Sequence, residues 1–71
     1  MTNDQATIDD VLTLMQEAQT LTLRGELWYY IDTRLRDAIM LTYEIESYDL
    51  RETLRFDISY WIRFDWYEYN F

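Results

Sequence analysis

The sequence predicts a small, mainly α domain of three helices, and two observations carry this prediction. First, turn-forming residues are scarce, since the 71-residue chain contains one glycine, two asparagines and no proline. β-hairpins usually need Gly or Asn in their turns, so this scarcity favours helices. Second, apolar residues recur every three or four positions along most of the chain. The length predicts one acidic domain covering residues 1–71.

The first helix is predicted to begin near Thr7. Thr7 precedes Asp10 by three residues, as in a capping box in which Asp replaces the usual Glu or Gln. Gly25 can adopt the left-handed conformation that commonly follows a helix, so it is predicted to end this one. The apolar face of the helix consists of Ile8, Val11, Leu12, Met15 and Ala18.

A second helix is predicted from about residue 26 to residue 46, with a single apolar stripe. Asp32 precedes Arg36 by four residues, an order that stabilises a helix by about 0.2–0.5 kcal/mol. The stripe consists of Leu27, Ile31, Leu35, Ala38, Leu41 and Ile45.

A third helix is predicted to open near Leu50, because Asp49 and Glu52 form a second capping pair. Its apolar residues form two stripes, and a three-helix core needs only one of them. The surplus aromatic stripe therefore indicates an interface. The core stripe consists of Leu50, Leu54, Ile58, Trp61 and Ile62. The aromatic stripe consists of Phe56, Tyr60, Phe64, Tyr67 and Phe71.

The alternative fold is α+β, with an N-terminal helix and a C-terminal antiparallel β-hairpin across residues 41–66. Every even position from Leu54 to Trp66 is apolar, and this period of two is typical of a strand. Residues 41–46 alternate as well. The connecting turn would be residues 47–51, which lack Gly, Asn and Pro, so three helices are preferred.

The composition argues against enzymes and metal proteins. Hydrophobic residues make up 49% of the chain, which is ample for a compact core. Cysteine, histidine and lysine are absent, which removes disulfides, the usual zinc ligands and most catalytic bases and nucleophiles. Ser47 and Ser59 have no histidine to activate them. We therefore predict a non-enzymatic protein without a metal or cofactor, and interpret the acids around Glu44 as a solvated helix end.

The termini and the charge bear on location and partners. No apolar run approaches the length of about 18 residues that spans a bilayer, and the first ten residues carry three acids and no base, the reverse of a secretory signal. This predicts a cytoplasmic protein. The net charge of −8 disfavours direct binding to nucleic acid or anionic lipid and favours a basic protein partner. Fourteen acids offset by six arginines are too few to imitate a duplex, but they can replace a short run of phosphates.

Aromatic residues are concentrated at the C-terminus, where they make up eight of the last sixteen residues. A domain of about 60 residues buries only about 60% of the surface that its unfolded chain exposes. Some of these aromatic side chains are therefore predicted to contact a partner. Trp28, Leu54 and Ile58 are assigned to the core. The predicted partner-binding residues are Tyr60, Phe64, Asp65, Trp66, Tyr67, Glu68, Tyr69 and Phe71. The predicted acidic face consists of Asp9, Asp10, Glu17, Glu44, Glu46, Asp49 and Asp57.

Together these features predict an acidic inhibitor or adaptor that docks on a basic, nucleic-acid-binding protein surface. Small acidic proteins of this size and charge are often counter-defence proteins of phages or mobile elements, such as anti-CRISPR or anti-restriction factors. The analogy with these proteins depends only on the size and the charge of the chain. The alternative is a structural helical homo-oligomer or homodimer, in which the aromatic C-terminal stripe is self-complementary and the acidity only keeps the protein soluble.

Overall fold

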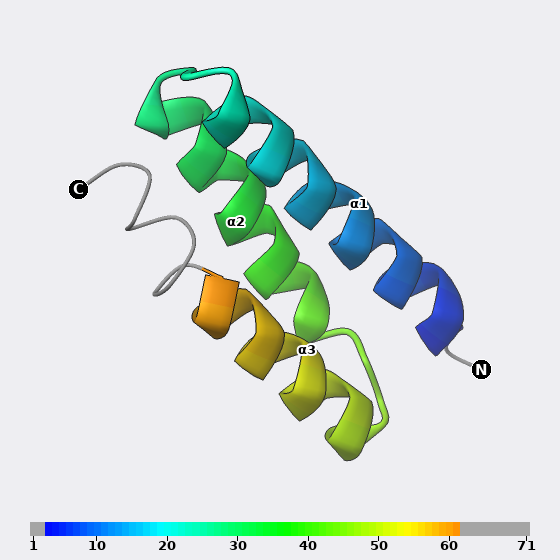
Figure 1. The fold of residues 1–71 in the computed structure, drawn as a ribbon. Coiled ribbons are helices and arrows are strands. Elements are labelled where there is room, and N and C mark those ends of the chain that lie inside the picture. Colours follow the sequence, from blue (N-terminus) through cyan, green and yellow to red (C-terminus); the bar gives the residue numbers. More distant parts are fainter. Residues whose placement is uncertain (1–2, 62–71) are drawn as a thin grey trace.

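Three α-helices form the part of the chain, residues 3–61, that the computed structural model describes. They are α1 (Asp4–Leu23), α2 (Trp28–Thr42) and α3 (Tyr48–Tyr60) (Figure 1). This confirms the three-helix prediction. The alternative fold with a β-hairpin is wrong, because residues 3–61 contain no strand and Leu54 to Tyr60 are helical. The helix brings Leu54, Ile58 and Trp61 into the core together, which a strand of alternating faces would not.

Helix α1 begins earlier than its capping pattern predicted. The N-cap is Asn3, whose side-chain oxygen accepts a hydrogen bond of 3.2 Å from the backbone N–H of Ala6. Thr7 lies inside the first turn, and its hydroxyl donates to the backbone oxygen of Asn3 instead of capping the helix. The prediction of a start near Thr7 is therefore wrong by one turn, because Asn3 satisfies the first free N–H groups upstream.

The other end of α1 confirms the role of Gly25. Its φ is +71°, in the left-handed region that glycine adopts without strain. The N–H of Gly25 donates to the oxygen of Thr22, and the N–H of Glu26 donates to the oxygen of Leu21, both at 3.0 Å. These two bonds define a Schellman motif, which reverses the chain into α2.

Helix α2 is shorter than predicted and its ion pair is confirmed. It starts at Trp28 because the Schellman turn uses the two residues before Leu27, and it ends at Thr42. Beyond that residue, the N–H of Ile45 donates to Thr42 at 3.2 Å and forms a tight turn. Within the helix, a guanidinium nitrogen of Arg36 lies 3.8 Å from the carboxylate of Asp32.

Helix α3 starts at Tyr48, two residues before the predicted position. Its N-cap is Ser47, whose hydroxyl oxygen accepts from the N–H of Leu50 at 3.4 Å, so the predicted capping pair of Asp49 and Glu52 is wrong. Asp4, which is distant in sequence, holds the loop before α3 by hydrogen bonds. The carboxylate of Asp4 accepts from the N–H of Glu46 at 3.1 Å and from that of Ser47 at 3.2 Å.

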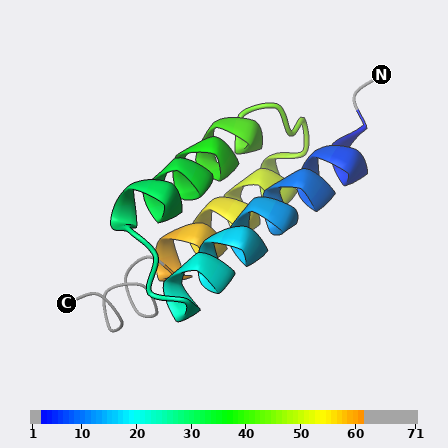
Figure 2. The same ribbon diagram turned by 90° about the horizontal axis from the view of Figure 1, so that it is seen from above.

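The core is enclosed by all three helices. Figure 1 shows α2 between α1 and α3, whereas Figure 2, from above, shows α3 between the other two. The helices therefore form a triangle in cross-section, with α1 and α2 antiparallel. One core cluster contains Val11, Ala38, Ile45, Leu54 and Ile58. A second contains Ala18, Ile31, Leu35 and Trp61.

Most of the predicted core residues are buried, but Trp28 is not, and Leu12, Leu27 and Leu50 of the predicted apolar stripes are also exposed. Leu54 and Ile58 are buried as predicted, whereas Trp28 is 63% exposed. Trp28 is the first residue of α2, and Trp61 occupies the core at this end of the bundle beside Ile31. Ile62 lies outside the described residues. No helix within residues 3–61 has both the length and the apolar character required to cross a membrane.

Candidate interaction surfaces

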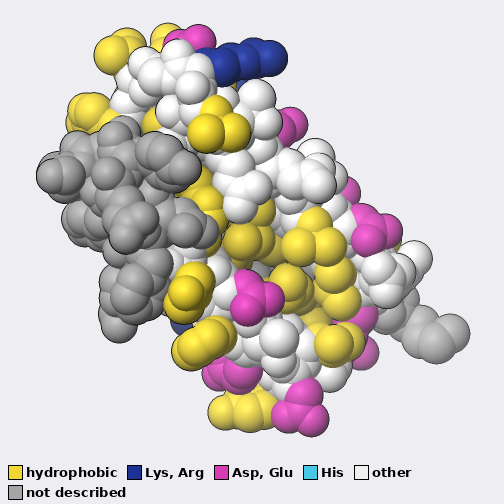
Figure 3. All heavy atoms as spheres, viewed as in Figure 1, with side chains coloured by type: hydrophobic (Ala, Val, Ile, Leu, Met, Phe, Trp, Pro, Cys, Tyr) yellow, Lys and Arg dark blue, Asp and Glu magenta, His cyan; other side chains and the backbone are white. Residues whose placement is uncertain are grey.

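Aromatic side chains lie mainly on the surface of the described bundle. Of the eight aromatic residues in positions 3–61, seven are at least 46% exposed, and only Trp61 is buried. Figure 3 shows hydrophobic side chains along the middle of one face, with acidic side chains scattered around them. The exposed aromatic residues are Trp28, Tyr29, Tyr30, Tyr43, Tyr48, Phe56 and Tyr60.

The predicted aromatic stripe begins on α3. Phe56 and Tyr60 are both exposed, as expected for side chains that the core does not need. Tyr60 is the one predicted partner-binding residue that the structure describes. The other residues of the stripe and of the predicted contact set lie outside the described residues: Phe64, Asp65, Trp66, Tyr67, Glu68, Tyr69 and Phe71.

A second apolar surface, which the sequence analysis missed, lies on α2. We call Trp28, Tyr29, Met40 and Tyr43 the outward face of α2. All four side chains are at least 60% exposed, and a shallow hollow runs between the first three, lined also by Arg36. The signal in the sequence is the run of three consecutive aromatic residues at positions 28–30. A helix with about 3.6 residues per turn cannot direct three consecutive side chains into one core.

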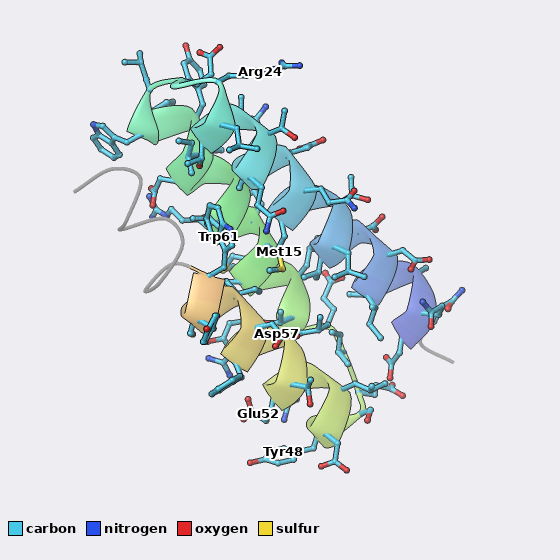
Figure 4. All side chains as sticks on the ribbon, in the orientation of Figure 1. Met15, Arg24, Tyr48, Glu52, Asp57 and Trp61 are labelled. Carbon is cyan, nitrogen blue, oxygen red and sulfur yellow. The ribbon has the colours of Figure 1, made fainter. Side chains whose placement is uncertain are left out.

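Tyrosine and arginine side chains bridge α2 and α3 beside this face. The Nη2 atom of Arg55 donates to Tyr43 Oη at 3.1 Å, and its guanidinium carbon lies 4.8 Å from the centre of the Tyr43 ring. The Nη1 atom of Arg55 is 3.9 Å from a Glu52 carboxylate oxygen. Figure 4 shows Glu52 on the side of α3 away from α1. Arg55 therefore makes three contacts within the molecule, two with Tyr43 and one with Glu52.

A second arginine is held in the same way one turn earlier on α3. The guanidinium carbon of Arg51 lies 5.4 Å from the centre of the Tyr48 ring, and its Nη1 atom is 3.5 Å from the backbone oxygen of Ile45. Cation–π contacts at exposed sites contribute about 0.5–1 kcal/mol each. The arginines of α3 thus stabilise the packing of α3 and its preceding loop.

Next to the outward face, on the side of α2 that meets α1, lie acidic residues, and Asp37 and Met40 border both surfaces. We call the shallow depression lined by Leu14, Asp37, Met40, Leu41 and Glu44 the α1–α2 groove. Leu14 and Leu41 are half-buried and pack on the core beneath it.

Three carboxylates border the groove without an ion pair to any residue in positions 3–61. Asp37 and Glu44 line it directly, and Asp10 lies one helical turn before Leu14 on the same side of α1. Glu17, one turn after Leu14, forms an ion pair with Arg34. The Nε atom of Arg34 lies 3.6 Å from a carboxylate oxygen of Glu17. The groove thus ends at a neutralised pair and is otherwise acidic.

The structure brings together only part of the predicted acidic face. Asp10, Glu17 and Glu44 lie on the α1–α2 side, with Asp37 added. The other predicted acids lie elsewhere: Asp9 accepts from Gln5 on α1 at 2.9 Å, Asp49 is in the first turn of α3, and Asp57 is an exposed residue of α3. Glu46 belongs to the loop before α3.

The remaining chemistry within residues 3–61 is sparse. No three acidic side chains there are grouped closely enough to hold a metal ion. The Ser47 hydroxyl is occupied in capping α3. No protein-family model matches the chain, and neither a curated protein nor a solved structure shows significant similarity to it. The functional argument therefore depends on the two surfaces described above.

Proposed function

We propose that this protein is a non-enzymatic binding domain that docks on a basic surface of another protein and acts there as an inhibitor or adaptor. The observation that supports this is the exposure of seven of its eight described aromatic side chains. Trp, Tyr and Arg are enriched among the residues that dominate binding energy at interfaces. Large exposed apolar patches on soluble proteins usually mark interaction sites.

The aromatic and acidic residues have different roles in this proposal. Burial of the outward face of α2 supplies most of the affinity, since aromatic side chains bury a large area at low entropic cost. The net charge of −8 speeds association with a basic partner and selects against acidic ones. A nucleic-acid-binding surface in the cytoplasm, such as that of a CRISPR complex or a restriction nuclease, fits this chemistry, because carboxylates can replace a few phosphates.

A second candidate, a homo-oligomer, is favoured by the mixed charges on the same face. The hollow on α2 contains Asp32 and Arg36 together with Trp28, Tyr29 and Met40. Two copies related by a two-fold axis would place the aspartate of each chain near the arginine of the other. The self-complementary surface is then the outward face of α2.

Light scattering combined with a capture experiment separates the two candidates. The first predicts an 8.8-kDa monomer at micromolar concentration, and capture of basic proteins from a host lysate that high salt releases. The variant Trp28→Ser with Tyr29→Ser should abolish this capture. A bait of the same composition in scrambled order shows how much capture net charge alone produces.

Two results would contradict the first candidate. A salt-insensitive dimer that the double variant converts to a monomer would establish the homo-oligomer instead. Capture no stronger than that of the scrambled bait would show that the fold contributes nothing. The parallel variant Trp66→Ala with Tyr67→Ala tests the predicted C-terminal contact residues under the same conditions.

A further inference from the structure

We infer that the α1–α2 groove binds a basic amphipathic helix of the partner protein. This inference rests on the proposed function and specifies where and how the partner binds. It is carried by three features of the described bundle: the open seam between two antiparallel helices, the apolar floor of that seam, and the unpaired carboxylates along it.

The shape of the groove suits a helix. Two antiparallel helices present a seam on each side, and α3 packs along one of the two seams of the α1–α2 pair. The groove lies on the other seam, where Leu14 and Leu41 are half-buried and Met40 is 67% exposed. A helix laying an apolar stripe into such a groove is a common mode of peptide recognition. The partner helix would thus repeat, on the open side, the packing that α3 makes on the closed side.

The charges of the groove select a basic helix. Asp10, Asp37 and Glu44 have no cation among residues 3–61, because four of the five arginines in this range contact other groups. The fifth, Arg24, follows the end of α1, at the far end of the bundle from the labelled Tyr48 (Figure 4). Among residues 3–61, therefore, no cation compensates the negative charge that the groove presents beside its apolar side chains. Lysine or arginine residues flanking a leucine stripe complement both features.

The spacing of the carboxylates specifies the pattern further. Asp37 and Glu44 are seven residues apart, which corresponds to about 10 Å along a helix. A partner helix lying along the groove would match them with basic residues at positions i and i+7. The ion pair between Arg34 and Glu17 limits the site, because the Glu17 carboxylate is already neutralised and does not attract a basic residue of the partner. Between Arg34 and Glu44 there is room for about three turns of helix.

A designed peptide tests this inference directly. The probe is a dye-labelled 14-residue helical peptide with leucines at i, i+3 and i+7 and lysines flanking that stripe, and its binding is followed by fluorescence anisotropy. A peptide of the same composition in scrambled order is the control. We expect the patterned peptide to bind at least tenfold more tightly than the scrambled one at low salt, with a difference that persists at physiological salt.

Variants with matched charge locate the site. The triple variant Asp10→Asn, Asp37→Asn and Glu44→Gln should weaken binding of the patterned peptide at least tenfold. The control variant Asp9→Asn, Glu26→Gln and Asp57→Asn removes the same three charges outside the groove and should change binding less than threefold. Met40→Gln removes an exposed apolar side chain that borders both the groove and the outward face of α2, and should weaken peptide binding at unchanged net charge. Circular dichroism melting confirms that each variant is folded.

The possible outcomes separate this inference from the proposed function. Equal losses in the two triple variants, or equal binding of patterned and scrambled peptides, would overturn the groove while leaving a general preference for basic partners. Absence of peptide binding, with capture of basic proteins through the outward face of α2, would also overturn the groove alone. Absence of both peptide binding and capture would overturn both.

Discussion

Helix α2 has two neighbours, and it meets them in different ways. Against α1 the two backbones approach closely along the length of the pair, with Ala18 and Ala38 fully buried. Against α3 the backbones approach over a shorter stretch, and long side chains such as Tyr43 and Arg55 bridge the two helices. The distance between packed helices depends on the side chains at their contact, so the first seam is narrow and the second is wide.

This difference determines where the charges of the protein are available. The wide seam accommodates arginines, which are held there by tyrosine rings, backbone oxygens and carboxylates. The narrow seam carries one such bridge, between Arg34 on α2 and Glu17 on α1. Three other acidic side chains beside it, Asp10, Asp37 and Glu44, have no ion pair within residues 3–61. The binding surface that we propose for a basic partner would thus follow from the way in which the helices pack.

The largest effect is expected from removing a core side chain that anchors α3. Ile58 is 1% exposed and packs with Val11, Ala38 and Leu54. Ile58→Ala should lower the free energy of unfolding by about 2–5 kcal/mol, measured by urea denaturation, because it leaves a cavity. The control Met40→Ala, at an exposed position, should change it by less than about 0.5 kcal/mol. Equal costs would show that α3 does not depend on Ile58.

A substitution in the turn between α1 and α2 tests the connection between the two helices that form the narrow seam. Gly25→Ala forces a side chain into the left-handed region, so it should cost about 1–2 kcal/mol of stability, followed by thermal melting. No atom lies within 4 Å of the added Cβ, so the cost comes from the backbone alone. Gly25→Asn should cost less, since asparagine tolerates this conformation better. A variant with alanine as stable as the natural chain would contradict the Schellman turn.

The link between α1 and the loop before α3 should have an intermediate effect. Asp4→Ala removes both hydrogen bonds to the backbone of Glu46 and Ser47, and should cost about 1 kcal/mol, measured by urea denaturation. Asp9→Ala removes a carboxylate from the same helix without breaking a contact to the loop. If the two substitutions cost the same, the link contributes no more than general electrostatics.

The smallest effect is expected at the tyrosine–arginine bridge of the wide seam. Arg55→Met keeps much of the apolar stem but loses the contacts with Tyr43 and Glu52, which should cost about 0.5–1 kcal/mol in thermal melting. Arg36→Met breaks a more exposed ion pair with Asp32 and should cost less. A larger loss at Arg36 would show that the wide seam is not held by its arginine bridges.

The sequence predicted the helices and most of the core, because the spacing of residues such as Ile31, Leu35 and Ile58 depends only on local periodicity. It did not predict the helix starts. Thr7 and Asp49 fit the capping patterns, but Asn3 and Ser47 come earlier in the chain and bond to the first free N–H groups. Pattern alone does not rank competing caps that lie within one turn of each other.

The candidate surfaces were harder to predict, because they depend on tertiary packing. Trp28 was assigned to the core, but whether it is buried depends on which side chain fills that end of the bundle, and Trp61 does so. Asp37 was not selected as an acidic-face residue. Its place beside Leu14 follows from the register between α1 and α2, which no local pattern encodes.

The hydrogen bonds of Asp4 also bear on the order in which the protein folds. They join residues 42 and 43 positions apart in the chain, whereas the turn at Gly25 closes over a few residues. Closing a long loop costs more entropy than closing a short one, so the α1–α2 hairpin should form first and the Asp4 contacts afterwards. During synthesis on the ribosome, Asp4 emerges long before the loop that it fastens. The first residue of the first helix is therefore expected to be among the last to reach its native partners.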